Sequence, residues 1–155
     1  MRSYGAGTTR SGINTADTAY FNLTNAATAA GLWVMQIVII QAVNPTTAPV
    51  FYLTKTTARG TQASTAAGQP IFSGSQASTG TLDVCGTGGS QPTFTAGNKI
   101  DMAALPLTVG SAWVFNFFDD PLEVPATSAN GIAIANAVAS GVTTGTFYCG
   151  VRWRE

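Results

Sequence analysis

The sequence has 155 residues, of which 45% are hydrophobic and only 9% are charged. A chain of this length fits one ordinary domain, which buries roughly 70% of the surface that its unfolded chain exposes. Seven Lys and Arg residues balance seven Asp and Glu residues. No basic stripe is therefore available to neutralise a phosphate backbone, and we expect no nucleic-acid partner.

The first sixteen residues predict an extended N-terminal arm. From Met1 to Ala16 the sequence is polar and Gly-rich without apolar periodicity, and such a segment contributes little to a core. It also lacks the apolar run of a signal peptide, which predicts synthesis and use without Sec export. Removal of this arm is expected to leave residues 17–155 as a folded single domain.

Eight strands are predicted after the arm, because short apolar or alternating runs recur between turn-forming residues. Helix signals are nearly absent, since no long window holds a clean i, i+3, i+4, i+7 apolar face. In chain order the predicted strands are Ala19–Leu23, Leu32–Val43, Val50–Thr56, Thr81–Cys85, Lys99–Ala104, Ala112–Phe118, Gly131–Val138 and Thr146–Trp153.

In three of these predicted strands, the pattern of apolar residues also indicates which faces are buried. The apolar run that begins at Leu32 is about half the roughly 20 residues needed to cross a bilayer, so we interpret it as a core strand and expect no membrane association. Ala112–Phe118 is apolar on both faces, which favours a central strand or one at a subunit contact. In Thr146–Trp153 apolar residues alternate with polar ones, which predicts an inner and an outer face.

Two predicted connections, Ala58–Pro70 and Gly86–Gly97, exceed the roughly 2 to 5 residues of a hairpin loop. Long connections favour Greek-key crossovers over a meander. The sequence therefore predicts an all-β fold, a jelly-roll-like antiparallel β-sandwich or barrel with an extended N-terminal arm. Another β-sandwich is the alternative.

The chain contains no His. This excludes Ser-His-Asp and Cys-His nucleophile pairs and the usual His-containing zinc sites, and we expect no enzyme activity and no cofactor. Asp119, Asp120 and Glu123 place three carboxylates within five residues, where they could bind Ca²⁺ or act as a glycosidase pair. A solvated turn before Pro121 is the favoured interpretation.

Other side chains have a structural and a functional interpretation. Cys85 and Cys149 could pair, but two reduced buried thiols are favoured. The Gly86–Gly89 run lacks the Lys and the helix of a phosphate-binding loop, so we interpret it as a β-loop. Aromatic side chains could stack on sugars, although a core position is favoured for each. These aromatic candidates are Trp33, Trp113, Trp153, Tyr20, Tyr52 and Tyr148.

The last third of the sequence resembles the end of small jelly-roll decoration, or cement, proteins of tailed bacteriophages. An aromatic strand at Ala112–Phe118 precedes a Pro-Leu-x-Val-Pro turn within Asp119–Pro125. A Gly-started apolar strand at Asn130–Asn136 and a terminal strand at Thr146–Glu155 that ends in Val-x-Trp-x-Glu complete the pattern. The pattern covers about 44 residues, and the rest of the chain matches no family.

This resemblance implies a virion structural protein that sits on the capsid exterior as a homotrimer, binds the major capsid protein and is made in the host cytoplasm. It also implies that the arm reaches across the shell or a neighbouring subunit. A receptor- or glycan-binding head or tail appendage is the alternative function. The interface candidates are Arg2, Tyr4 and Arg10 in the arm and Tyr148, Arg152 and Arg154 in the last strand.

Overall fold

The computed structural model describes residues 2–13, 15–26, 30–71, 76–85, 90–95, 98–137 and 145–155. Within these ranges the chain forms twelve strands and no helix. The strands are β1 (Ser3–Ser11), β2 (Thr18–Asn25), β3 (Leu32–Val43), β4 (Val50–Thr56), β5 (Gln62–Ala67), β6 (Gln69–Pro70), β7 (Gly80–Cys85), β8 (Asp101–Ala104), β9 (Ala112–Asn116), β10 (Leu122–Val124), β11 (Gly131–Asn136) and β12 (Thr146–Arg154).

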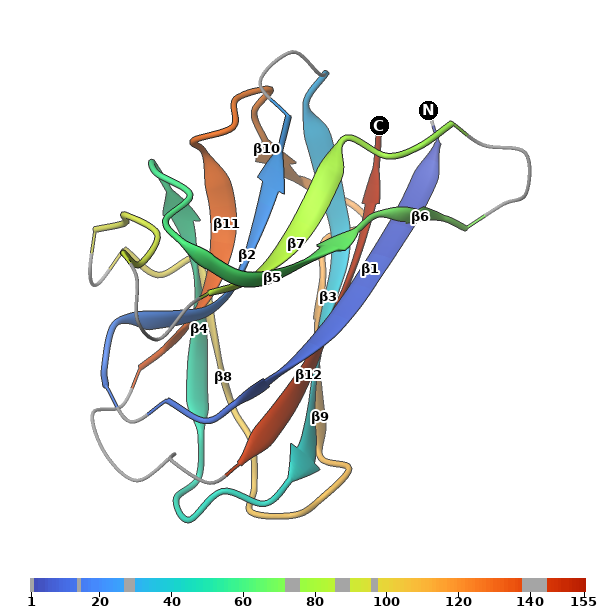
Figure 1. Ribbon diagram of the computed structural model, residues 1–155. Coiled ribbons are helices and arrows are strands. Elements are labelled where there is room, and N and C mark those ends of the chain that lie inside the picture. Colours follow the sequence, from blue (N-terminus) through green and yellow to red (C-terminus); the bar gives the residue numbers. More distant parts are fainter. Residues whose placement is uncertain are drawn as a thin grey trace.

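The strands form two antiparallel sheets that pack face to face (Figure 1). Sheet A has the order β10-β3-β12-β1-β6, with β9 beside β10 along the same edge of β3. Sheet B has the order β5-β7-β2-β11-β4-β8. Without β5, β6 and β7, the strand order and the crossings between sheets are those of a jelly roll, which is built from two Greek keys. The predicted fold class is confirmed.

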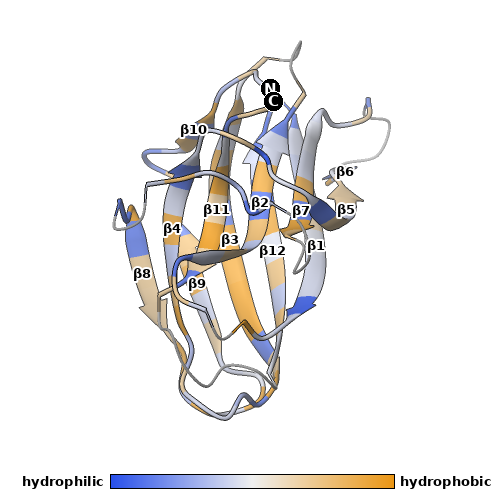
Figure 2. Cartoon of the chain, turned by 60° about the vertical axis from the view of Figure 1, so that its left-hand side comes forward, coloured by the Kyte–Doolittle hydropathy of each residue, from blue (hydrophilic) through white to orange (hydrophobic). Residues whose placement is uncertain are grey.

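The core lies between the sheets, where long hydrophobic stretches of β3, β4 and β11 face inward (Figure 2). Three aromatic rings meet edge to face at its centre. The centroid of Tyr20 lies 5.2 Å from that of Phe51 and 5.6 Å from that of Phe147, and the latter two lie 5.0 Å apart. Such edge-to-face pairs add to the stabilisation from buried area.

The predicted strands correspond to β2, β3, β4, β7, β8, β9, β11 and β12, with ends that differ by a few residues. The predicted end of one strand, Val138, lies outside the described residues, as does the Gly86–Gly89 run. The connection expected over Ala58–Pro70 instead contains β5 and β6.

The first residues are not a free arm. Strand β1 pairs with β12 along its whole length and with β6 at Tyr4 and Gly5. The prediction that this segment contributes little to the core is wrong, because the Tyr4 side chain is 2% exposed and stacks near Trp153. Backbone pairing on both sides holds β1 in place, and this pairing needs no apolar periodicity.

Strands β5, β6 and β7 form an insertion between β4 and β8. It extends sheet B beyond β2 and sheet A beyond β1, so that it covers one side of the sandwich. The buried carboxylate of Asp83 on β7 accepts two hydrogen bonds from the Arg59 guanidinium, both of 2.7 Å. It also accepts one of 3.0 Å from the Thr65 hydroxyl. This ion pair ties the start of the insertion to its last strand.

Candidate interaction surface

The outer face of sheet A is the best candidate for a binding surface. Cys149 and Val151 on β12 are buried, so Tyr148, Gly150 and Arg152, which alternate with them, face outward. Cross-strand pairing arranges the outward residues of β1, β12, β3 and β9 in three rows. The rows are Thr9-Tyr148-Ile40-Ala112, Gly7-Gly150-Val38-Val114 and Gly5-Arg152-Gln36-Asn116. We call these twelve residues the outer surface of sheet A.

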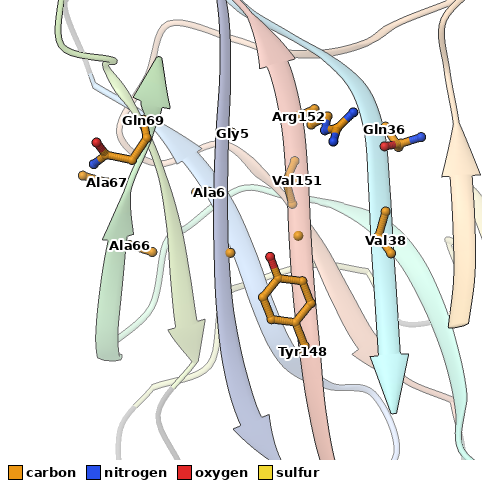
Figure 3. Close-up of a pocket in the computed structure, with 12 residues that line it drawn as sticks. Gly5, Ala6, Gln36, Val38, Ala66, Ala67, Gln69, Tyr148, Val151 and Arg152 are labelled. Atoms are coloured by element: carbon orange, nitrogen blue, oxygen red, sulfur yellow. The ribbon is translucent and has the colours of Figure 1, made fainter. Parts of the chain in front are cut away.

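Glycines open a depression of about 660 Å³ in this surface. Gly7 of β1 and Gly150 of β12 lie directly opposite each other, and a Cβ added at Gly7 would overlap with the Tyr148 ring. The absence of a side chain at Gly7 therefore lets Tyr148 lie over the strands. Figure 3 shows Tyr148 and Arg152 on β12 with Gln36 on the neighbouring strand around this depression.

The outer surface of sheet A carries little charge. Arg152 is the single charged residue among its twelve positions, while Val114 is 43% and Tyr148 is 36% exposed. The side chains of Gln36 and Asn116 are joined by a hydrogen bond of 2.8 Å. An antiparallel sheet that faces water on one side usually alternates hydrophobic inside with polar outside. Apolar outward side chains on three neighbouring strands depart from that pattern.

A charged row borders this surface toward the start of β1. Arg154 pairs in register with Trp33 of β3, and Trp33 pairs with Glu123 of β10. Both charged side chains are exposed, and the indole of Trp33 is half-buried between them. An aromatic ring beside a carboxylate and a guanidinium is an arrangement that can hold a polar ligand.

Four interface candidates are exposed, namely Arg2, Tyr148, Arg152 and Arg154. Two are not. Tyr4 is 2% and Arg10 is 8% exposed, because the alternation of β1 turns both side chains toward the interior. These two side chains therefore offer little exposed surface to a partner, unlike the other four.

The acidic candidates do not form a metal site. Among the residues that the structure describes, no group of three or more His, Cys, Asp and Glu side chains is placed to hold a metal ion. Asp119, Asp120 and Glu123 are all exposed. Glu123 belongs to β10, whereas Asp119 and Asp120 precede that strand.

The aromatic candidates divide between core and surface. Trp153, Tyr20 and Tyr52 are fully buried. In contrast, Trp113 is 43% exposed although it shares the face of buried Phe115, because β9 is an edge strand rather than the central strand that its sequence favours. Its alternative interpretation as a strand at a subunit contact is untested. The aromatic side chains that remain candidates for stacking on a sugar are Trp33, Trp113 and Tyr148.

Both cysteines are free and buried, as expected. Burial raises the pKa of the Cys85 thiol to about 12, and burial also raises the pKa of Cys149 above its ordinary value. Both side chains therefore remain protonated thiols at neutral pH, and a thiol is a poor nucleophile.

No protein-family model and no curated protein matches the sequence. Among solved structures, the chain is similar to a chain of the cyanophage Pam1 capsid asymmetric unit. The alignment has 17% identity and a TM-score of 0.33, and it covers 98% of this chain and 82% of that one. A similarity at this level does not define a shared function. No helix that could span a membrane occurs in the described part of the chain.

Proposed function

We propose that this protein is a non-enzymatic virion structural protein, a capsid decoration or cement protein that binds the shell of the major capsid protein from outside. It is made in the host cytoplasm and assembles as a homotrimer. The observation that carries the proposal is the outer surface of sheet A, which is broad, weakly charged and partly apolar. The resemblance of residues 112–155 to cement proteins supports the same function.

The side chains of this surface suit a protein partner. Binding surfaces are depleted in charge at their centre, and Tyr and Arg are enriched among the residues that contribute most to affinity. Here Tyr148 and Arg152 lie on one strand, and the glycines of β1 and β12 leave room for a partner's side chain. Val38 and Val114 supply apolar area on the neighbouring strands.

A charge placed on this surface tests the proposal. We expect Val114→Glu to weaken co-sedimentation with purified shells by more than tenfold, because burial of an unpaired carboxylate in an interface is costly. Met102→Glu is the matched control, since Met102 is 44% exposed on β8 of the other sheet. Sedimentation velocity without shells gives the oligomeric state. Equal shell binding by both variants would contradict the assignment of this surface.

A receptor- or glycan-binding appendage is the second candidate function. The row Arg154-Trp33-Glu123 favours it, since an indole between two charged groups can stack on a sugar and hydrogen-bond its hydroxyls. A protein that ignores shells but binds a glycan array, with binding lost in Trp33→Ala, would replace the first proposal with this one.

A further inference from the structure

Arg10 is a buried cation at the end of β1. Its side chain faces inward and is 8% exposed. Burial lowers its pKa below the ordinary value of an arginine, although a guanidinium stays charged at every physiological pH. The positively charged Arg10 side chain is therefore more than nine-tenths buried beside the core.

No carboxylate of this chain pairs with Arg10. All seven Asp and Glu residues lie within the described ranges, and the ion pair found there joins Arg59 to Asp83. The Arg10 guanidinium also makes no hydrogen bond to any residue that the structure describes. A largely buried charge that forms no ion pair or hydrogen bond with the protein keeps only part of its hydration, which is unfavourable.

Arg10 lines a pocket of about 300 Å³. Residues from the end of β1, from β5 and from β7 line this pocket, among them Ser11, Gly12, Ala63 and Cys85. No nitrogen of the Arg10 guanidinium is both shielded from solvent and without a hydrogen-bond partner. Because these nitrogens make no hydrogen bond to the described residues, they reach solvent, and the pocket is the open space that Arg10 lines. A volume of this size is at the lower limit of small-molecule sites.

We propose that this pocket, which we call the Arg10 pocket, binds a small oxyanion through the Arg10 guanidinium. The planar fork of a guanidinium matches the oxygens of a carboxylate or a phosphate and binds them by two parallel hydrogen bonds. The Cys85 thiol stays protonated beside it and adds no competing negative charge. The oxyanion supplies the counter-charge that the chain itself does not provide.

Two probes distinguish a free inorganic anion from a carboxylate group as the ligand of the Arg10 pocket. Inorganic phosphate and acetate are the probes, each titrated by calorimetry at constant ionic strength against chloride. Tighter binding of phosphate assigns the pocket to a free inorganic anion. Tighter binding of acetate assigns it to a carboxylate, such as that of an acidic side chain of a partner.

Arg10→Met tests whether Arg10 is the ligand. We expect this variant to lose the rise in melting temperature that the preferred anion gives the wild type, and to bind that anion at least tenfold more weakly. Lys55→Met removes an equal charge from an exposed position on β4 and should keep both effects. Arg10→Lys retains the charge without the fork and should bind at an intermediate level.

Anion binding that is the same in Arg10→Met and the wild type would overturn the proposal, as would a wild type that distinguishes neither probe from chloride. If Arg10→Met does not fold, the calorimetric comparison of the wild type with Arg10→Lys decides. Equal affinities in those two proteins would overturn the proposal. The Arg10 pocket shares only Thr9 with the outer surface of sheet A. Neither Arg10 nor Val114 belongs to both, so loss of anion binding in Arg10→Met and loss of shell binding in Val114→Glu are separate results.

Discussion

Trp153 is the largest side chain that the sandwich encloses completely. Its ring lies 6.4 Å from that of Tyr4, and its indole N–H donates a hydrogen bond of 3.2 Å to the Glu155 carboxylate. We expect Trp153→Ala to lower the free energy of unfolding by about 3 to 5 kcal/mol, because the loss of a buried aromatic leaves a cavity. Urea unfolding measures the change. Trp113→Ala, at a 43% exposed tryptophan, is the control and should cost clearly less.

The cysteines are expected to resist modification. A raised pKa keeps the Cys85 thiol protonated until the pH approaches about 12. Alkylation of the native protein by iodoacetamide should therefore stay slow from pH 7 to 9, whereas an exposed thiol reacts faster over that range. Mass spectrometry follows the reaction, with urea-unfolded protein as the reactive control. Fast alkylation of either native cysteine would contradict the burial of these thiols.

At the scale of residues, the sequence predicts the burial of some side chains and not of others. The alternation of Phe147, Cys149, Val151 and Trp153 was sufficient to predict their burial, since each contributes an apolar side chain. The burial of Arg10 was not predictable from its own chemistry, because the pairing of β1 with β12 decides which way it points. The pairing of neighbours in space is information that one sequence does not carry.

At the scale of elements, the strands that sequence patterns missed are those held by backbone pairing. Strand β5 is mostly exposed, and β10 has three residues. Strand β1 contributes one large apolar side chain, Tyr4, to the core. Periodic apolar residues are the main sequence signal of a strand, so these segments resemble loops. For β9 the same signal misleads, because its exposed apolar residues lie at a sheet edge.

Deletion of residues 1–12 tests the role of β1. This deletion removes Tyr4 from the core and leaves one edge of β12 unpaired. We expect the truncated chain to lose its cooperative thermal transition or to aggregate, since an exposed central strand is a template for pairing with other chains. This reverses the expectation from sequence. Circular dichroism and size-exclusion chromatography are the measurements, and a soluble truncation with an unchanged melting temperature would contradict it.

The Arg59–Asp83 ion pair tests how the insertion is anchored. Asp83 is fully buried, while the Arg59 side chain is 34% exposed and can return to water when its partner is lost. In a double-mutant cycle with Asp83→Asn and Arg59→Met, we expect a coupling free energy of about 1 to 3 kcal/mol. Additive effects of the two changes on urea unfolding would show that the pair does not hold the insertion.

At the scale of the whole molecule, low charge predicts how the protein associates. Its net charge is zero and its outer surface of sheet A carries one arginine. Salt screens interactions between exposed charges and leaves apolar contacts in place. We therefore expect shell binding to change by less than about threefold between 50 and 500 mM NaCl. A steep loss of binding with salt would instead assign the contact to the arginines around that surface.

The position of β12 has a consequence for the order of folding. This strand lies between β1 and β3, so sheet A joins segments from opposite ends of the sequence. The edges of β1 and β3 that pair with β12 stay unpaired during synthesis until β12 has left the ribosome. Folds dominated by such distant pairings fold slowly, in about milliseconds to seconds. The nascent chain therefore keeps one edge of the apolar strand β3 unpaired until β12 is made, and an unpaired edge of this kind favours aggregation.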